Sequence, residues 1–445
     1  MLVLDGEELK MKVKHTLMAS NGKALWYVNL LSLTGNTGLL LLMKKGLTAC
    51  FVLISLLVYS QKITISGQAI DKETKEPLIF ASVGIKGKPI GTITNLQGEF
   101  DFHIPNEYRN DIFVISMLGY GTFEVPAWTL LERPALVIEM TRSIQVLNEV
   151  VVSDTLKGGD ILQIALSRIE TNYPMTPFLL DGFYRDIKKI GGTFVSLLEA
   201  AVKIYDEDYN APRNKFKLRE RVLLLEVRRS LGYSSKFTSY FDEGNLLEDL
   251  LLHNNVRYRQ FPEEEVFFTS LQREKDSNYD NHEIYVVSHS SSDYRLKLYI
   301  DKISYSIIHM EYENDQQSEI SKKRGMQSRF VGIKRVIDFK EYNGKMYLNY
   351  LTIDSKINWY DAKTDVLKFE TELHQQLLIN EVFSKTSERI GTTEKMRSYG
   401  LQFQDMPYNK EFWDNYNVIK ETPLDKKIIE DLEKQGPLDK QFENN

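Results

Sequence analysis

The fold is decided by two stretches, Arg329-Phe-Val-Gly-Ile-Lys-Arg-Val-Ile-Asp-Phe-Lys340 and Lys345-Met-Tyr-Leu-Asn-Tyr-Leu-Thr-Ile-Asp-Ser-Lys-Ile-Asn-Trp359, which flank the dipeptide Asn343-Gly344. Asn and Gly both accept the positive φ that a two-residue hairpin turn requires. Both stretches are rich in β-branched and aromatic residues, which favour strands. The sequence therefore predicts a hairpin of two long antiparallel strands.

Neighbouring stretches extend this hairpin into a meander. Strands are predicted at residues 178–187, 193–205, 283–289, 294–300, 305–312 and 366–379. Large apolar residues alternate with polar ones along them, so one face must be buried. We expect that face to carry Leu296, Leu298, Ile300, Tyr347, Tyr350 and Ile353. Two coverings stay open: helices of this chain at 160–172 and 244–252, or an external ligand or partner.

The first helix is predicted from the spacing of Ile161, Leu162, Ala165, Leu166 and Ile169, and it ends before Pro174. The second is predicted from the apolar pairs at 246–247 and 250–251. The basic stretch 210–229 predicts a solvated loop or strand face rather than an anion site. In the tail, we expect an aromatic cluster to dock on the domain and the charged end to lack structure; the cluster is Tyr408, Phe412, Trp413 and Tyr416.

Residues 62–152 are predicted to form shorter strands with more closely spaced turns. Seven short strands are expected, the last two at 135–140 and 146–152, with turn residues between them, which indicates a small β-sandwich. The segment Glu99-Phe-Asp-Phe-His-Ile104 alternates strictly and places Phe100, Phe102 and Ile104 on one face. Gly98, in the preceding turn, can take a positive φ.

Dispersed motifs in this segment agree in order with a known family. They are Gly67-Gln-Ala-Ile-Asp71, Pro77-Leu78, Ala81-Ser-Val83, Gly91-Thr92, Thr94-Asn95, Gly98-Glu-Phe100 and Leu118-Gly-Tyr120. The segment resembles the carboxypeptidase regulatory-like domain, a transthyretin-like sandwich found at the front of Bacteroidetes envelope proteins. The resemblance implies that fold and an exported protein, but it implies no catalysis, because the module accompanies peptidases without cutting peptides.

Two further segments resemble known proteins. Leu147-Asn-Glu-Val-Val-Val152 is similar to the segment that joins this domain to the plug of TonB-dependent receptors; a last edge strand is the alternative. The run from Leu298 to Tyr312 resembles lipoprotein-carrier-like half-barrels, which hold lipid chains against a curved sheet.

Residues 43–61 have the layout of a secretory signal peptide. Lys44 and Lys45 precede an apolar run from Leu47 to Val58, and Ser60 is a small residue at its end. We expect residues 1–42 to precede the true start of the protein; an internal membrane anchor is the alternative. Cys50 is the single cysteine and lies in the segment that is removed, so the mature chain would have no thiol.

The predicted fold class is mainly β: a seven-stranded Ig/transthyretin-like sandwich followed by a larger antiparallel (α+β) sheet domain with a few helices. The predicted organisation is a doubtful extension (1–42), a signal peptide (43–60), the sandwich (62–152), a linker (153–160), the sheet domain (161–405) and a charged tail (406–445).

No catalytic, cofactor-binding or metal-binding residue is predicted. A zinc peptidase would need a His-x-x-Glu pair, and none of the seven histidines is followed by Glu at that spacing. Phosphate loops, nucleophile elbows and EF-hand loops are also missing from the sequence. His282, His289 and His309 are the only close histidine group, and exposed strand positions explain them as well as a metal does. The net charge of −6 argues against a nucleic-acid partner.

These observations predict an exported, non-enzymatic protein of the periplasm or the outer-membrane surface, associated with the envelope membrane, with no cofactor. Its sandwich would act as an adapter and its sheet would bind a lipid-like hydrophobic ligand or a partner protein. Two alternatives stay open: a hydrolase acting on peptides or glycans, and an accessory of a TonB-dependent outer-membrane transporter. The oligomeric state stays open.

Signal-peptide cleavage gives the first testable prediction. We expect export to begin at Met43 and cleavage to fall near Ser60–Gln61, because the lysine pair precedes an apolar run too short to span a bilayer. The intact mass of the protein from its native host measures this directly. A mature product that retains residues 1–42 would contradict it.

Overall fold

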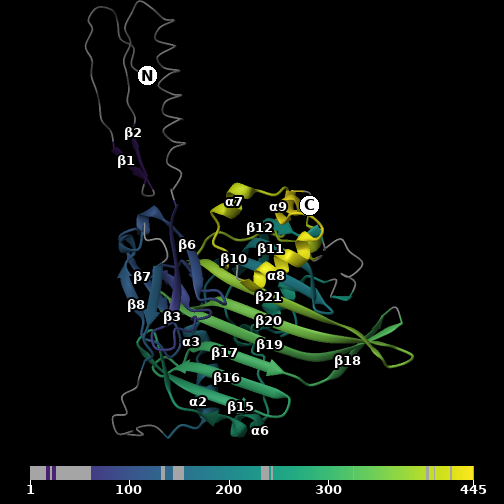
Figure 1. Ribbon diagram of the computed structural model, residues 1–445. Coiled ribbons are helices and arrows are strands. Elements are labelled where there is room, and N and C mark those ends of the chain that lie inside the picture. Colours follow the sequence, from purple (N-terminus) through teal and green to yellow (C-terminus); the bar gives the residue numbers. More distant parts are fainter. Residues whose placement is uncertain are drawn as a thin grey trace, which may run out of the picture. The chain divides into compact units, whose positions relative to one another are not determined.

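One antiparallel sheet of twelve strands forms the centre of the larger domain in the computed structural model (Figure 1). The structure describes residues 17–20, 23–26, 62–131, 136–143, 155–231, 240–241, 244–323, 325–396, 400–404, 406–420 and 423–443. The predicted signal peptide and the segment 147–152 lie outside these residues. Contacts divide the chain into two units, Met1–Gln61 and Lys62–Asn445. In the first, β1 (Leu17–Ser20) and β2 (Lys23–Trp26) pair antiparallel.

The strands of the large sheet include every strand that the sequence predicted for it. Its order is β12-β11-β10-β21-β20-β19-β17-β16-β15-β13, with β14 paired to β15 and β18 to β19. The hairpin is confirmed, because Tyr342 pairs with Lys345 across Asn343 and Gly344, both at positive φ. The strands are β10 (Phe178–Ile190), β11 (Thr193–Asp206), β12 (Arg221–Arg229), β13 (Gln272–Arg273), β14 (Ser277–Tyr279), β15 (His282–Ser290), β16 (Tyr294–Asp301), β17 (Ile307–Asn314), β18 (Ser318–Lys323), β19 (Met326–Tyr342), β20 (Lys345–Asp361) and β21 (Leu367–Ser384).

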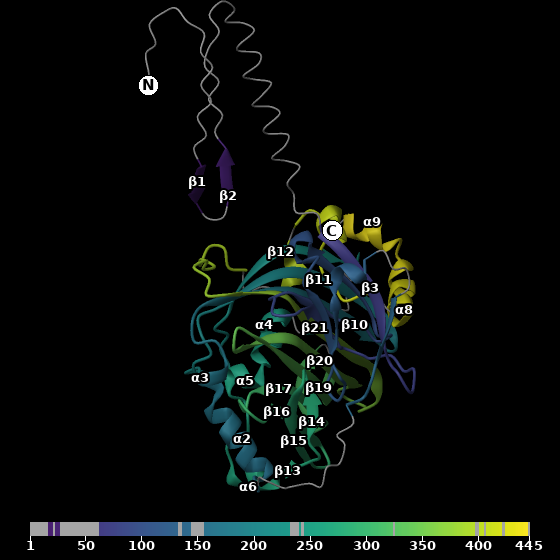
Figure 2. The ribbon, with the colours of Figure 1, turned by 90° about the vertical axis from the view of Figure 1, so that its left-hand side faces the viewer.

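Helices of this chain cover one face of the sheet, which we call the inner face. There, strand residues such as Leu198, Leu298 and Leu351 form one core with Ile161 and Leu250 from the helices. Figure 2 shows α2, α4 and α5 on this side. The helices are α2 (Gly158–Ser167), α3 (Ile169–Asn172), α4 (Leu246–Leu252), α5 (Asn255–Tyr258) and α6 (Glu265–Ser270).

The prediction that Tyr350 lies on the same face as Tyr347 and Ile353 is wrong. It lies on the opposite, outer face, where it packs against Phe80 and Phe183, whereas Tyr347 and Ile353 belong to the inner core. The register between β19 and β20 shifts between Asp338 and Phe339, so Asp338 pairs with Tyr350 and Phe339 with Leu348. Tyr350 is three residues from Tyr347 and three from Ile353, so the period-two alternation of a strand places it on the face opposite to both.

The C-terminal segment covers part of the outer face. Trp413 and Tyr416 pack with Phe183 of β10, which confirms docking of the aromatic cluster. The expectation of a structureless end is wrong for residues 423–443, because Ile428, Leu432 and Phe442 are buried there. The elements are η5 (Leu401–Phe403), α7 (Lys410–Asp414), α8 (Pro423–Glu433) and α9 (Leu438–Glu443). No helix among the described residues is long and apolar enough to cross a bilayer.

The N-terminal domain is a sandwich of two sheets, with strand orders β6-β3-β9 and β5-β4-β7-β8. Among the described residues the sandwich has seven strands, of which six were predicted and β8 was not; the strand expected at 146–152 lies outside the described residues. The elements are β3 (Lys62–Asp71), β4 (Ser82–Ile85), β5 (Gly91–Ile93), β6 (Glu99–Pro105), η1 (Asn106–Tyr108), β7 (Ile112–Ser116), β8 (Phe123–Pro126), η2 (Ala127–Thr129) and β9 (Leu136–Met140). The mainly β fold class is therefore confirmed.

Main-chain hydrogen bonds join the sandwich to the sheet. The amide of Val382 donates to the carbonyl of Pro89, and the amide of Gly119 donates to that of Asn278, each over 2.8 Å. Ile90 and Glu381 form an antiparallel bridge beside the first of these. Sandwich and sheet are thus fixed to each other at two places.

Core packing in the sandwich gives the second prediction. Phe100 and Phe102 are fully buried, and Phe100 stacks on Phe113 with ring centroids 5.9 Å apart. Phe100→Ala or Phe102→Ala should each lower the free energy of unfolding by about 3–5 kcal/mol, because each leaves a cavity. Urea denaturation measures this. Val137→Ala, at a half-exposed position of β9, is the control and should change stability by less than about 0.5 kcal/mol.

Candidate functional site

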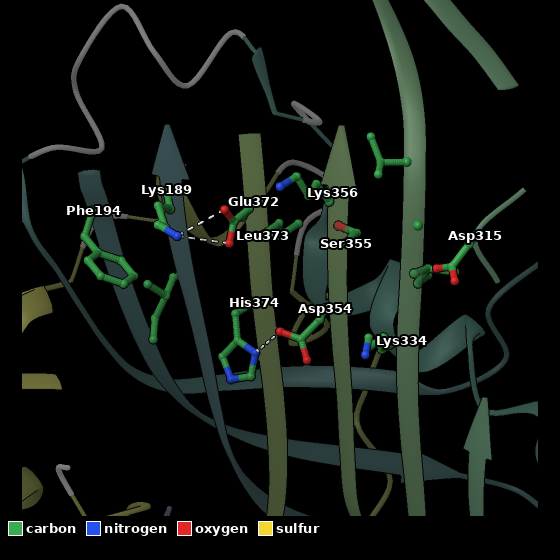
Figure 3. Close-up of a pocket in the computed structure, with 14 residues that line it drawn as sticks. Lys189, Phe194, Asp315, Lys334, Asp354, Ser355, Lys356, Glu372, Leu373 and His374 are labelled. Atoms are coloured by element: carbon green, nitrogen blue, oxygen red, sulfur yellow. Dashed lines mark hydrogen bonds and ion pairs between the residues drawn. The ribbon is translucent and has the colours of Figure 1, made fainter. Parts of the chain in front are cut away.

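A shallow groove crosses the outer face of β10, β21, β20 and β19 (Figure 3). It has a volume of about 290 Å³, and its lining combines apolar side chains with three lysines and three carboxylates. Lys189 pairs with Glu372 over 3.0 Å, and His374 pairs with Asp354 over 2.5 Å. The other two lysines of the groove are also paired, Lys356 with Glu370 and Lys334 with Glu313. Its charges neutralise one another, so it offers no net charge to a ligand.

A second hollow, of about 340 Å³, lies where the sandwich meets the outer face. His309 stands in its wall between two carboxylates: its Nδ1 lies 3.0 Å from Asp338 and its Nε2 lies 3.6 Å from Glu311. Asn349 donates a further hydrogen bond to Asp338 over 2.8 Å. These contacts fix the imidazole on both ring nitrogens.

The charge state of His309 is set by Asp338 and Glu311; we call this arrangement of the three residues the His309 clamp. Burial alone would lower its pKa, but hydrogen bonds and charges from Asp338 and Glu311 outweigh burial and raise the pKa to about 9. The imidazole is therefore protonated at neutral pH. A protonated ring with both nitrogens engaged cannot accept a proton, so His309 does not suit the role of a general base.

Lys340 lies at the same junction. Its Nζ donates to the hydroxyl of Ser82 over 3.3 Å, and burial lowers the pKa of the lysine. The amine also sits against Gly84, where a Cβ atom would approach Nζ to 2.7 Å. A serine beside a lysine of lowered pKa is one arrangement that activates a nucleophile.

The largest of these hollows, about 580 Å³, opens on the inner face. It lies where α4 and α5 end and the chain 260–262 faces β16, β17 and β19. Half of its lining residues are aromatic or apolar, and the polar half includes the guanidinium of Arg335. The lining residues are Lys215, Phe216, Asp249, Leu252, His253, Asn255, Gln260, Phe261, Pro262, Tyr294, Tyr312 and Arg335. This volume is typical of a small-molecule pocket.

The three histidines singled out in the sequence do not come together. His282 pairs with Asp301 over 2.9 Å, and His289 contacts the hydroxyl of Ser270 over 2.8 Å. Within the described residues, no group of three potential metal ligands is present.

Sequence reasoning missed Arg335. The available signal was its place between Ile333 and Ile337, because the alternation of β19 assigns position 335 to the apolar face.

Comparisons with known proteins agree with the sandwich geometry. Residues 65–152 match the family model described as CarboxypepD_reg-like domain. This segment is a CarboxypepD_reg-like domain. The match covers less than a quarter of the chain, so it concerns the sandwich alone.

A segment of 75 residues is 37% identical to the TonB-dependent receptor SusC of Bacteroides thetaiotaomicron. The segment is 17% of this chain and 7% of that receptor, so the chain spans a small part of the relative's length. Among solved structures, lipovitellin covers 49% of this chain at 8% identity with a TM-score of 0.22. A Bacteroides fragilis protein described as membrane-associated and of unknown function covers 73% at 10% identity with a TM-score of 0.15. The chain covers 26% of the former and 99% of the latter.

The His309 clamp gives the third prediction. Its folded-state pKa of about 9 exceeds the ordinary value of 6.5, so its contribution to stability is full below about pH 6.5 and is lost as pH rises through about 9. The stability difference between the wild type and His309→Gln should therefore be larger at pH 6 than at pH 10, by up to about 3 kcal/mol. Urea denaturation at both pH values measures this.

His103→Gln is the matched control. Burial, and then the charge of Lys62, lower the pKa of His103, so its removal should alter the pH dependence only below about pH 6.5. A His309→Gln difference that stays constant from pH 6 to pH 10 would contradict the clamp.

Proposed function

We propose that this protein is an exported, non-enzymatic envelope protein whose sheet domain binds a hydrophobic ligand in the inner-face pocket beside Arg335. The observation that carries the proposal is the pocket itself, with a volume of about 580 Å³ and walls that include Phe261, Tyr294 and Tyr312. A cavity of this volume with several aromatic rings in its wall is typical of a small-molecule site.

The contents of the other two hollows support this choice. The groove of Figure 3 is charge-balanced, and the histidine in the junction hollow is held in its protonated form. Neither offers a free general base beside an exposed nucleophile.

The sandwich fits an adapter role. It is fixed to the sheet by the Pro89–Val382 and Gly119–Asn278 hydrogen bonds, so a partner bound to the sandwich would be attached to the sheet domain as well. The CarboxypepD_reg-like domain and the similarity of one segment to SusC favour a location in the envelope of a Bacteroidetes cell.

A second candidate is an accessory of a TonB-dependent transporter. The segment that is 37% identical to SusC favours it. Chemical cross-linking in host cells followed by mass spectrometry would test this candidate. Cross-links from the sandwich to a TonB-dependent receptor would favour it over free ligand binding.

A hydrolase is the third candidate, and the contact between Lys340 and Ser82 favours it. Ser82 is buried, however, so a substrate would need the sandwich to move off the sheet. Turnover of peptide or glycan substrates that is lost in Ser82→Ala would establish this candidate instead of the binder.

Native mass spectrometry of protein gently purified from host membranes tests the leading proposal. We expect a bound apolar molecule in stoichiometric amount. Leu252→Trp, which fills the pocket, should reduce its occupancy at least about tenfold, while Lys356→Met in the groove of Figure 3 should leave occupancy unchanged. A wild-type protein recovered bare, or equal loading of the Leu252→Trp variant, would contradict it.

A further inference from the structure

We propose that the inner-face pocket selects an organic anion, a carboxylate joined to an apolar body, and that Arg335 anchors its head group. This inference rests on the proposed function and names the class of ligand. The observation behind it is a buried guanidinium in the pocket wall that has no carboxylate partner.

Arg335 is buried on the inner face. Its residue surface is 6% exposed, and on the neighbouring strands it lies opposite Tyr312 and Ile353. The guanidinium donates to the side-chain oxygen of Asn255 and lies over the ring of Tyr312, 4.7 Å from its centroid. Its Nε is buried and has no acceptor. A buried charge without a counter-charge is costly, and a bound anion would remove that cost.

Other buried arginines of the domain have carboxylate partners. Arg257 forms two hydrogen bonds with Asp206, at 2.5 and 3.0 Å. Arg185, which is also buried, pairs with Glu199 over 2.6 Å. For Arg335, no carboxylate of the described chain takes this place: burial lowers its pKa to about 10, and only the phenols of Tyr312 and Tyr294 oppose that effect. Arg335 thus differs from the other buried arginines in partner, not in burial.

The pocket around the guanidinium suits an apolar body. Leu252, Phe261 and Pro262 line it, and Tyr294 packs edge-on against Tyr312 with centroids 5.4 Å apart. Phe216, also in the wall, is 84% exposed. An exposed aromatic ring at a pocket is typical of a surface that a ligand covers.

Neighbouring titratable groups leave the anchor role to Arg335. Burial, and then the charge of Arg335, lower the pKa of His253 to about 4, so that imidazole is neutral at neutral pH. Lys215 is already paired with Glu263 over 2.6 Å. Asp249 also lines the pocket, but it does not contribute to the pKa of Arg335. A carboxylate head group would find one cation, planar and able to form two parallel hydrogen bonds.

Isothermal titration calorimetry of the mature full-length protein, with dodecanoate, dodecanol and inorganic phosphate as probes, tests the inference. We expect dodecanoate to bind at one site at least about tenfold more tightly than dodecanol, because a hydrogen bond to a charged group adds about 1.5–3 kcal/mol. Phosphate alone should bind much more weakly, because it lacks the apolar body.

Two variants at Arg335 identify the anchor. Arg335→Met should retain dodecanol binding and lose the preference for dodecanoate. Arg335→Lys keeps the charge without the planar fork and should retain part of that preference; it keeps the test valid if the Met variant does not fold. Lys356→Met, in the groove of Figure 3, is the control and should behave as the wild type.

The outcomes separate this inference from the proposed function. Equal affinity for dodecanoate and dodecanol, or a preference that persists in Arg335→Met, would overturn the anion site, while apolar binding would still support the binder. Phosphate binding as tight as dodecanoate would overturn the apolar body. Absence of binding by all probes would overturn the anion site, and the native mass spectrum would then decide the proposed function by itself.

Discussion

A twelve-stranded antiparallel sheet has two broad faces, and the apolar parts of both must be kept from water. This constraint organises the rest of the structure. The inner face is covered by α2, α4 and α5, which lie before and between the strands in sequence. Part of the outer face is covered by the sandwich at the front of the chain and by α7, α8 and α9 at its end. The sheet is thus buried by segments that are hundreds of residues apart.

The two covers of the outer face also meet each other. Asn417 of the C-terminal segment accepts a hydrogen bond from the amide of His103 over 2.8 Å and donates one to its carbonyl over 3.1 Å. Lys420 pairs with Asp101 on the same strand over 3.1 Å. The C-terminal segment therefore links β6 of the sandwich with the sheet, so the sandwich is held by backbone on one side and by the tail on another.

The strands could be predicted from local patterns, whereas the contacts between distant segments could not. Asn343-Gly344 and the alternation around it fixed the hairpin. The pairing of β10 with β21, from Phe178 with Ser384 to Ile190 with Thr371, joins residues about two hundred positions apart, and no local pattern reports it. The predicted face of Tyr350 is wrong because Tyr350 lies three residues from both Tyr347 and Ile353, and alternation places such a residue on the opposite face. The helices of residues 423–443 were not predicted, because charged residues there outnumber the few apolar positions, such as Ile428 and Leu432, that form the buried side.

The candidate site was hidden for a related reason. A single arginine in a strand ordinarily points to water, so its residue type alone does not mark Arg335 as a site residue. Close packing of the inner face is complete beneath α2 and α4, where leucines and isoleucines of helix and sheet meet. The cover ends at His253 and α5, and there the pocket opens. Tyr294, Tyr312 and Arg335 face this opening. The stability of the sheet does not require a buried cation here, since an apolar residue of similar volume is often neutral or stabilising at such a position. The proposed anion would account for the charge.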